Sequence, residues 1–259
     1  SPVALEGLCK KCIGGHWGQS PRMSELAEQN KIIAYNLPQG IISQLFRTAA
    51  AHQPGVLSDI GIGTFIDTRE KGRRLNDITK EYIIQLMKID GKEYLFYPSL
   101  YPDVAFLRAT TADTEGYVTM EDEVLYLDAL AIASATHNNG GLVIMQVQKI
   151  VKAGSLHPRQ VKIPGYMVDA LVVVPDQMQL YDAPVNRFIS GDYTMDASEK
   201  THFPLNQRTL VARRALMEVT VGDVGNVGVG IAAGIGLVAR DEGVDEQFIL
   251  TVEAGPVGG

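Results

Sequence analysis

Short apolar runs alternate with amphipathic helical patterns along the first two thirds of the chain. The expected helices span residues 24–29, 41–51 and 121–136, and the expected strands span residues 32–35, 94–97, 104–109 and 142–147. The last of these strands is rich in β-branched and other apolar residues, which is typical of a buried strand. Because strands and helices take turns along the sequence, the pattern predicts an α/β fold with crossover helices.

Glycine-rich and polar stretches interrupt this pattern at two places. The segment from Gly61 to Asp77 begins with two glycines and continues with many charged residues, so it is predicted to be an exposed loop. The four residues from Asp113 to Gly116, Asp-Thr-Glu-Gly, have the composition of a tight turn.

A polar, irregular stretch between residues 182 and 204 separates the first part of the chain from a second α/β pattern. We therefore predict a first domain over residues 1–190, a linker over 191–207 and a second domain over 208–259. In the second domain the expected helices span residues 208–219 and 231–240, and the expected strands span residues 225–230 and 248–252. Two strands and two helices do not bury a sheet on both faces, so we expect this domain to be incomplete and to need further polypeptide.

Composition narrows the class of protein further. Apolar residues make up 46% and charged residues 20% of the 259 residues, so the chain is an ordinary globular one. Its net charge of -7 and scattered basic residues argue against binding of nucleic acid. The glycine-rich apolar stretch at residues 224–239 is too short for a membrane span, and the first residues do not resemble a secretory signal. We expect a cytoplasmic protein that does not bind a membrane.

Cys9 and Cys12 form a single C-x-x-C pair. Such a pair provides half of a zinc site, but the chain has no second pair, and its five histidines do not have the spacing of zinc ligands. Plain reduced thiols are the favoured interpretation, and no metal is predicted. His16, beside Trp17, either orients a substrate or packs in a loop, and the second alternative is favoured.

Glu253 directly follows the expected strand at residues 248–252 and precedes the glycine-rich segment at 254–259. A carboxylate at the carboxyl end of a strand lies where α/β sheets bind ligands. Small neighbouring residues leave room for a substrate carbonyl, so Glu253 is a candidate nucleophile. The alternative is a structural carboxylate that caps the next helix.

Two motifs near the end of the chain resemble those of family I CoA-transferases. The segment Val252-Glu253-Ala254-Gly255 and the following Pro-Val-Gly-Gly look like the E-x-G active-site segment of that family. Upstream, residues 226–230, Asn-Val-Gly-Val-Gly, resemble the N-x-G-x-G strand that opens the family's second domain. Ala232 departs from the proline that many members carry, which affects the helix entry and not the nucleophile. A dinucleotide-binding glycine motif is disfavoured, because a helix precedes these glycines where that motif requires a strand.

The first half of the chain extends the resemblance. Residues 15–17 (Gly-His-Trp) and 34–40 (Ala-Tyr-Asn-Leu-Pro-Gln-Gly) resemble the propionate and acetate CoA-transferase branch, and residues 110–116 and 162–165 follow in the family's order. The family's first glycine-rich loop would precede Ser1, and a later glycine loop would follow Gly259. We therefore expect the chain to be a fragment of two tandem CoA-transferase-type α/β domains.

The resemblance implies an activity and a set of site residues. Glu253 would attack an acyl-CoA thioester, and a glutamyl-CoA thioester would then pass CoA to a second short-chain carboxylic acid in a ping-pong reaction. Gln39 would donate a hydrogen bond to the oxyanion, and Gly228, Gly230 and Gly255 would line the CoA site. No cofactor is implied beyond CoA itself, and a homo-oligomer is expected. The alternatives are an acyl-CoA hydrolase on the same fold and a non-catalytic α/β ligand-binding protein.

Overall fold

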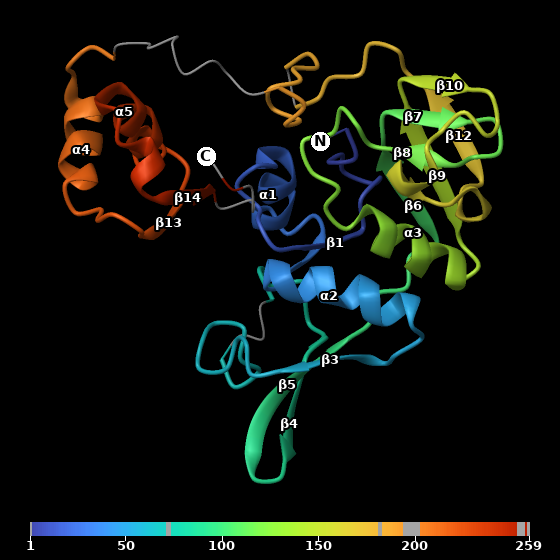
Figure 1. Cartoon of the computed structure of the whole chain (residues 1–259). Helices are drawn as coiled ribbons and strands as arrows, with labels where there is room; N and C mark the ends of the chain where they lie inside the picture. Colours follow the sequence, from blue (N-terminus) through green and yellow to red (C-terminus); the bar gives the residue numbers. More distant parts are fainter. Residues whose placement is uncertain (1, 71–73, 181–182, 194–202, 253–256, 258–259) are drawn as a thin grey trace. The chain divides into compact units, whose positions relative to one another are not determined.

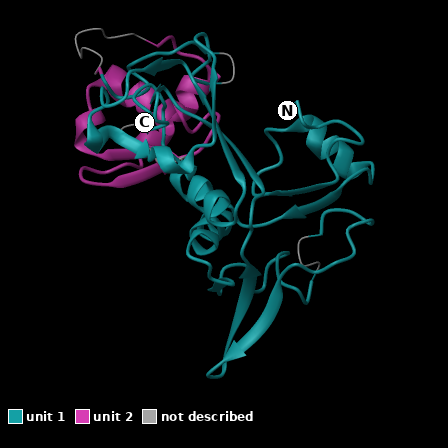
Figure 2. Ribbon diagram, turned by 90° about the vertical axis from the view of Figure 1, so that its right-hand side faces the viewer, with its two compact units in different colours: residues 1–192 teal, residues 193–259 magenta. Residues whose placement is uncertain are grey.

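The computed structural model describes residues 2–70, 74–180, 183–193, 203–252 and 257, and it has the mixed α/β architecture that the sequence predicts. The chain divides into two compact units, residues 1–192 and 193–259 (Figure 2). Most of the predicted linker, residues 194–202, lies outside the described residues, so its boundaries stay a prediction. Each unit is described by itself.

The first unit opens with two parallel strands and one helix, β1 (Lys11–Gly14), α1 (Pro21–Glu28) and β2 (Ile33–Asn36) (Figure 1). Pro21 occupies the first turn of α1, where a missing N–H has no consequence, so the helix begins three residues before the predicted start. Ala27, Ile32 and Ala34 are buried in a small core under this helix. In the strand pair, Cys12 lies opposite Ala34 and Gly14 opposite Asn36.

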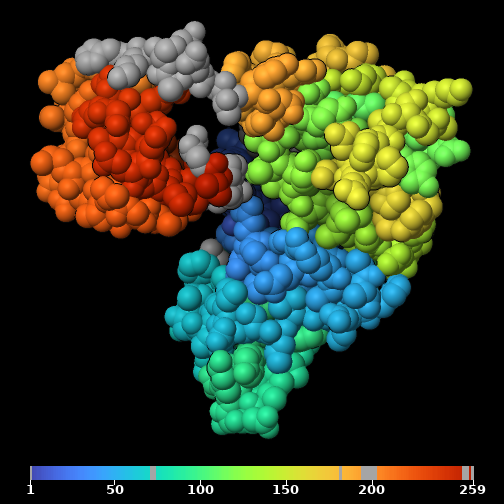
Figure 3. Space-filling view, viewed as in Figure 1, coloured from blue at the N-terminus to red at the C-terminus, as the bar shows by residue number. Residues whose placement is uncertain are grey.

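Helix α2 (Gln39–Ala50) packs on a three-stranded antiparallel sheet of β3 (Gly55–Ser58), β5 (Lys92–Pro98) and β4 (Gln85–Ile89), in the order β3-β5-β4. Ile41 and Leu45 of the helix are buried with Leu95 and Tyr97 of β5 in one core. Strands β4 and β5 form a hairpin arm that extends away from α2 in all three views of the molecule (Figures 1, 2 and 3).

The predicted exposed loop at residues 61–77 is wrong in part. Ile66 and Asp67 are buried, and Asp67 accepts hydrogen bonds from Arg69 and from the Gly63 N–H. These bonds hold the pKa of Asp67 well below its usual range, although burial acts in the opposite direction. Asp67 is buried as a charged residue because its ion-pair partner, Arg69, follows two positions later in the chain.

The rest of the first unit consists of two further sheets. A parallel sheet has the order β12-β9-β6, from β6 (Val104–Arg108), β9 (Leu142–Val147) and β12 (Ala170–Val173). A second sheet has the order β10-β7-β8-β11, from β7 (Thr111–Asp113), β8 (Val118–Thr119), β10 (Lys149–Val151) and β11 (Val161–Ile163). Helix α3 (Ala129–Asn138) contacts both sheets, and two 3-10 helices, Pro158–Gln160 and Gly165–Met167, flank β11. Val118, Val143 and Met145 are fully buried in the shared core.

Helix α3 begins eight residues later than the helix predicted at 121–136. Glu121 hydrogen-bonds with the hydroxyl of Thr111, and the Asp122 N–H donates to the Thr110 hydroxyl over 2.9 Å. Leu127 has a positive φ of 46°, which an α-helix does not contain. Tertiary contacts of residues 121–122 therefore replace the first two helical turns.

The second unit is a βαβ arrangement, as the sequence predicts. It contains α4 (Gln207–Leu216), β13 (Val224–Val227), α5 (Gly234–Glu242), a 3-10 helix (Asp245–Gln247) and β14 (Ile249–Val252), and β13 pairs with β14 in parallel. Asn206 and Thr209 form a capping box at the start of α4. Ala212, Val238 and Phe248 lie in its core. None of the helices in the described part of the chain is long and apolar enough to span a membrane.

Candidate active site

Gln39 is the first residue of α2 and follows β2 after a connection of two residues. Pro38 precedes the helix in an extended conformation, with φ of -57° and ψ of 129°, which places the chain direction change at this point. The Leu37 N–H donates to the Gly14 carbonyl over 3.0 Å, and the Leu37 side chain is buried. The residues before Gln39 are therefore fixed by β1 on one side and by the core on the other.

The side chain of Gln39 is exposed, and its amide has no hydrogen-bond partner among the described residues. No side chain caps the start of α2, so the N–H groups of its first turn do not donate hydrogen bonds to a capping side chain. These groups lie at the positive end of the helix dipole. Together with the Gln39 amide they provide hydrogen-bond donors suited to a developing negative charge.

A glycine turn at residues 14–18 packs against Gln39. A Cβ atom built on Gly15 would lie 2.7 Å from Cβ and 2.9 Å from Cα of Gln39. Within the turn, Trp17 folds back over Gly14, with its Nε1 3.4 Å from the position of a Cβ on Gly14. His16 is exposed, so a substrate-orienting role for it stays a prediction.

In the second unit, the carboxyl ends of β13 and β14 lie side by side. Val227 is opposite Val252, and Asn226 donates to the Thr251 hydroxyl over 3.1 Å. Gly228 follows β13 at this edge of the sheet, and Gly230 has a φ of 106°, a conformation that favours glycine. The parallel pairing thus brings the N-x-G-x-G glycines to the same strand ends that lead to position 253.

Glu253 and Gly255 lie outside the described residues, so their roles stay predictions. The structure describes β14 as Ile249–Val252, which lies within the strand predicted at residues 248–252. Gln39 belongs to the other unit, and its relation to Gly228 and Gly230 is likewise left as predicted from the resemblance.

The polar segment at residues 110–121 contains two carboxylates, Asp113 and Glu121, that the sequence analysis did not assign to a site. The side chain of Asp113 accepts hydrogen bonds from the N–H groups of Glu115 and Tyr117, both over 3.0 Å, and closes the predicted turn. Partial desolvation alone would raise the pKa of Glu121, but hydrogen bonds from Thr111 and Thr119, with the charge of Lys149, hold it below its ordinary value. Both carboxylates are hydrogen-bonded within the fold, so we assign them a structural role.

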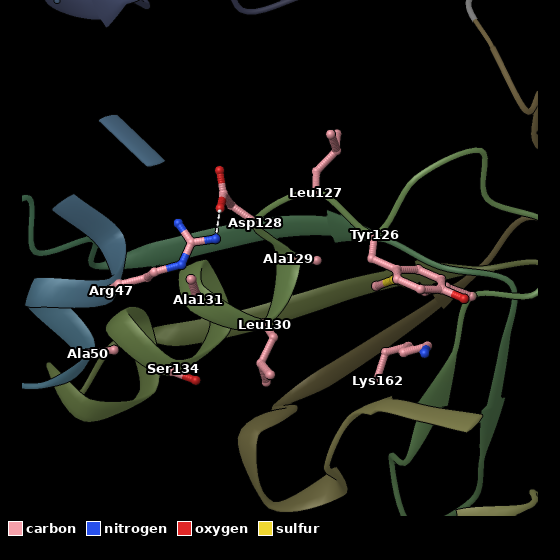
Figure 4. A pocket seen from close by; sticks show the side chains of 11 residues that line it. Arg47, Ala50, Tyr126, Leu127, Asp128, Ala129, Leu130, Ala131, Ser134 and Lys162 are labelled. Atoms are coloured by element: carbon pink, nitrogen blue, oxygen red, sulfur yellow. Dashed lines mark ion pairs between the residues drawn. The ribbon is translucent and has the colours of Figure 1, made fainter. Parts of the chain in front are cut away.

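A cavity of about 500 Å³ lies between α2, the start of α3 and β11 (Figure 4). Arg47 forms an ion pair with Asp128 over 2.9 Å on one side of it, and Lys162 lies 4.1 Å from the centre of the Tyr126 ring on the other. Gln39, the predicted site residue of this unit, does not line this cavity. Arg47 is eight residues along α2 from Gln39, about 12 Å at 1.5 Å per residue, so the cavity belongs to the opposite end of that helix.

The two cysteines contact the same small core as α1. Burial, and then the proximity of Cys9, raise the pKa of the Cys12 thiol, which favours the protonated form. In the described part of the chain, no group of three or more histidine, cysteine, aspartate or glutamate side chains is arranged to hold a metal ion. In the structure, the two cysteines of the C-x-x-C pair therefore pack against this apolar core.

The chain belongs to the coenzyme A transferase family, since the sequence model of that family, described as Coenzyme A transferase, matches residues 1–174. The resemblance noted in the sequence is thereby confirmed. Among its relatives is the Acetate CoA-transferase YdiF of Escherichia coli (strain K12), which is 68% identical over the whole chain. The Caffeate CoA-transferase of Acetobacterium woodii is 38% identical over 99% of the chain. The chain spans about half the length of these curated relatives, 49% and 50% respectively.

Solved structures agree with this assignment. The acyl-CoA transferase YdiF of E. coli O157:H7, determined as a thioester complex with CoA, is 66% identical with a TM-score of 0.91, and the match covers 100% of this chain and 52% of that one. Glutaconate coenzyme A-transferase from Acidaminococcus fermentans, at 22% identity and a TM-score of 0.54, shares the fold over 64% of this chain and 55% of its own. The predicted fold class, a CoA-transferase-type α/β fold, is therefore confirmed.

Proposed function

We propose that the protein transfers coenzyme A between a short-chain acyl-CoA and a free short-chain carboxylic acid. The observation that carries this proposal is the 68% identity to an acetate CoA-transferase along the whole chain, including the segments that hold Gln39 and Glu253. CoA is a substrate in this reaction, and no further cofactor is required. The two substrates exchange one thioester for another of similar energy.

In the proposed mechanism, the Glu253 carboxylate attacks the thioester carbonyl and displaces CoA as a thiolate, which gives a mixed anhydride. The thiolate then attacks the glutamyl carbonyl, releases the first carboxylate and leaves CoA bound to Glu253 as a thioester. An incoming carboxylate reverses these two steps and leaves as the new acyl-CoA, so the kinetics are ping-pong. The CoA thioester in the related solved structure supports an intermediate of this kind.

In this scheme we assign Gln39 as a hydrogen-bond donor to the oxyanion. Each addition puts negative charge on a carbonyl oxygen, and the exposed amide of Gln39 is free of other partners among the described residues. The start of α2 adds the positive end of its dipole. Gly228, Gly230 and Gly255 are proposed to let the backbone approach CoA closely, and the φ of 106° at Gly230 agrees with that use of glycine.

A covalent adduct tests the proposal directly. We expect the full-length protein, incubated with acetyl-CoA, to gain the mass of CoA less one water, and peptide mass spectrometry to locate the adduct on Glu253. The Glu253→Gln variant should not gain it. No adduct on the wild-type protein would contradict the proposal and favour a ligand-binding protein. Release of free thiol that is independent of an added carboxylate would indicate a hydrolase instead.

The proposal includes a cytoplasmic location and a homo-oligomeric state, because acyl-CoA is an intracellular substrate and the resemblance implies self-association. Light scattering of the purified full-length protein gives its mass in solution. A mass equal to one polypeptide would contradict the oligomer.

A further inference from the structure

The glycine turn at residues 14–18 lies directly against the backbone of Gln39. A Cβ on Gly15 would be 2.7 Å from Cβ and 2.9 Å from Cα of Gln39. Carbon atoms in ordinary contact are about 3.5–4.0 Å apart, so a side chain at position 15 would force one of the two backbones to move by about 1 Å. Glycine at position 15 therefore allows the first residue of α2 to lie close to the end of β1.

Conformation does not explain the glycine at position 15. Among the glycines of the chain, Gly15 is not one of those with φ in the left-handed region, so an alanine could adopt its backbone conformation. The neighbouring Gly14 is also outside that region, but the three atoms nearest to a Cβ on Gly14 belong to the Trp17 ring, at 3.4–3.9 Å. For a side chain added at one of these two positions, the nearest atoms therefore belong to Gln39 at position 15 and to Trp17 at position 14.

The surrounding contacts leave little room for an adjustment before Gln39. Gly14 is paired with Asn36 in the parallel β1–β2 ladder, and its carbonyl accepts the Leu37 N–H over 3.0 Å. Leu37 is buried in the core under α2. A displacement caused at position 15 would therefore fall on the first residues of α2.

We propose that Gly15 is a positioning residue, which sets the place of the Gln39 amide relative to the reacting carbonyl. This inference rests on the proposed function, in which that amide donates to the oxyanion. Such a donor acts over about 2.7–3.1 Å, and a misplacement of about 1 Å costs on the order of 100-fold in rate. Gly15→Ala should slow the reaction about 10- to 100-fold through this displacement alone.

The test measures the first half-reaction of the full-length protein. Thioester formation from saturating acetyl-CoA is followed by rapid quenching and mass spectrometry, and the affinity for a non-reactive thioether analogue of acetyl-CoA is measured by calorimetry. For Gly15→Ala we expect the rate to fall about 10- to 100-fold and the affinity to stay within about threefold, because the donor acts in the transition state. Gly14→Ala is the matched control and should keep the wild-type rate.

A double-mutant cycle separates positioning of Gln39 from a general disturbance. Gln39→Ala should slow the half-reaction, and adding Gly15→Ala to it should slow it no further. If Gly15→Ala alone has the wild-type rate, if Gly14→Ala is equally slow, or if the two effects multiply in the double variant, the inference is overturned. If Gln39→Ala itself keeps the wild-type rate, the donor assignment in the proposed function fails instead.

A second variant keeps the inference testable if Gly15→Ala does not fold. Gln39→Asn retains the amide but withdraws it by one methylene, at an exposed position where folding is not at risk. It should slow the half-reaction to a similar extent as Gly15→Ala. A wild-type rate for Gln39→Asn would mean that the place of the amide is unimportant, which also overturns the inference.

Discussion

Asp67 and Glu253 are two carboxylates with different proposed roles, the first in stability and the second in catalysis. Asp67 is buried, with 2% of its surface exposed, and accepts hydrogen bonds from three N–H groups of Arg69 and from the Gly63 N–H. Both of its carboxylate oxygens are therefore hydrogen-bonded within the fold. Glu253 follows a strand that ends at Val252 and is proposed to keep its carboxylate for a substrate. Replacing each carboxylate by its amide should therefore affect different properties.

Substitution of Glu253 should affect activity. Glu253→Gln is expected to abolish CoA exchange, since an amide is a far weaker nucleophile, and Glu253→Asp nearly so, since a carboxylate withdrawn by about 1 Å costs on the order of 100-fold. Exchange between acetyl-CoA and propionate measures both. Wild-type turnover by Glu253→Gln, without slow conversion back to glutamate, would show that another group is the nucleophile.

Substitution of Asp67 should affect stability, and with a definite dependence on pH. Because the folded pKa of Asp67 is depressed, its contribution is fully present above the unfolded value of about 3.9 and is lost as the pH falls below it. We expect Asp67→Asn to lower the free energy of unfolding by about 1–3 kcal/mol at pH 7, an amount reduced by the solvent exposure of Arg69. Urea unfolding at pH 7 and at pH 3 should show the difference from wild type shrinking at the lower pH. A constant difference would contradict this account.

At the scale of elements, the turn at residues 113–116 and the segment at 162–165 are two parts of one contact. A Cβ on Gly165 would lie 2.2 Å from the Glu115 carbonyl oxygen, and a Cβ on Gly116 would lie 3.2 Å from the Gly165 carbonyl oxygen. Gly116 also has a φ of 85°, which favours glycine. The backbones therefore touch where the sequence shows only two separated motifs.

Gly165→Ala should separate these two segments. Because the obstacle is backbone and not a flexible side chain, we expect a loss of about 1–3 kcal/mol in the free energy of unfolding. Gly40→Ala is a suitable comparison, since a Cβ there meets no atom within 4 Å and the residue lies in a helix, where alanine stabilises by up to about 1 kcal/mol. Urea unfolding compares the two variants, and equal stability of both would contradict the contact.

Strand β9 and the helix at α2 could be predicted from the sequence because a long apolar run or a helical period was enough to define each. The β4–β5 hairpin was missed, although Asp90 and Gly91, with φ of 49° and 81°, are the Asp-Gly pair that favours a two-residue hairpin turn. The start of α3 was not predictable, since it depends on the hydrogen bonds of Glu121 and Asp122 to Thr111 and Thr110, which are distant in the sequence.

At the scale of the whole molecule, the candidate site was predictable as motifs and not as geometry. Gln39 and the N-x-G-x-G glycines are identified by their neighbours in the sequence, and the structure places them at a helix start and at strand ends. Gly15 belongs to one of the motifs of the resemblance, but its role was not predictable, because that role depends on a contact with a residue 24 positions away. Glu253 stays a predicted nucleophile, since it lies outside the described residues.

The two units of the 259-residue chain should differ in stability. The first contains a buried core cluster of ten residues around the β12-β9-β6 sheet, whereas the core cluster beside the two-stranded sheet of the second has five members among the described residues. We expect backbone amides of β13 and β14 to exchange with deuterium at least about tenfold faster than those of β9. Hydrogen exchange with mass spectrometry measures both, and equal protection would contradict the expectation.

The hairpin arm also has a practical use in the study of this protein. Its turn at Asp90 and Gly91 is exposed and lies six residues along β5 from the buried Tyr97, about 20 Å at 3.3 Å per residue. Exposed turns tolerate inserted residues better than packed elements do. A short peptide tag or a fluorescent label placed there would therefore report on the molecule while leaving α2, and Gln39 at its start, undisturbed.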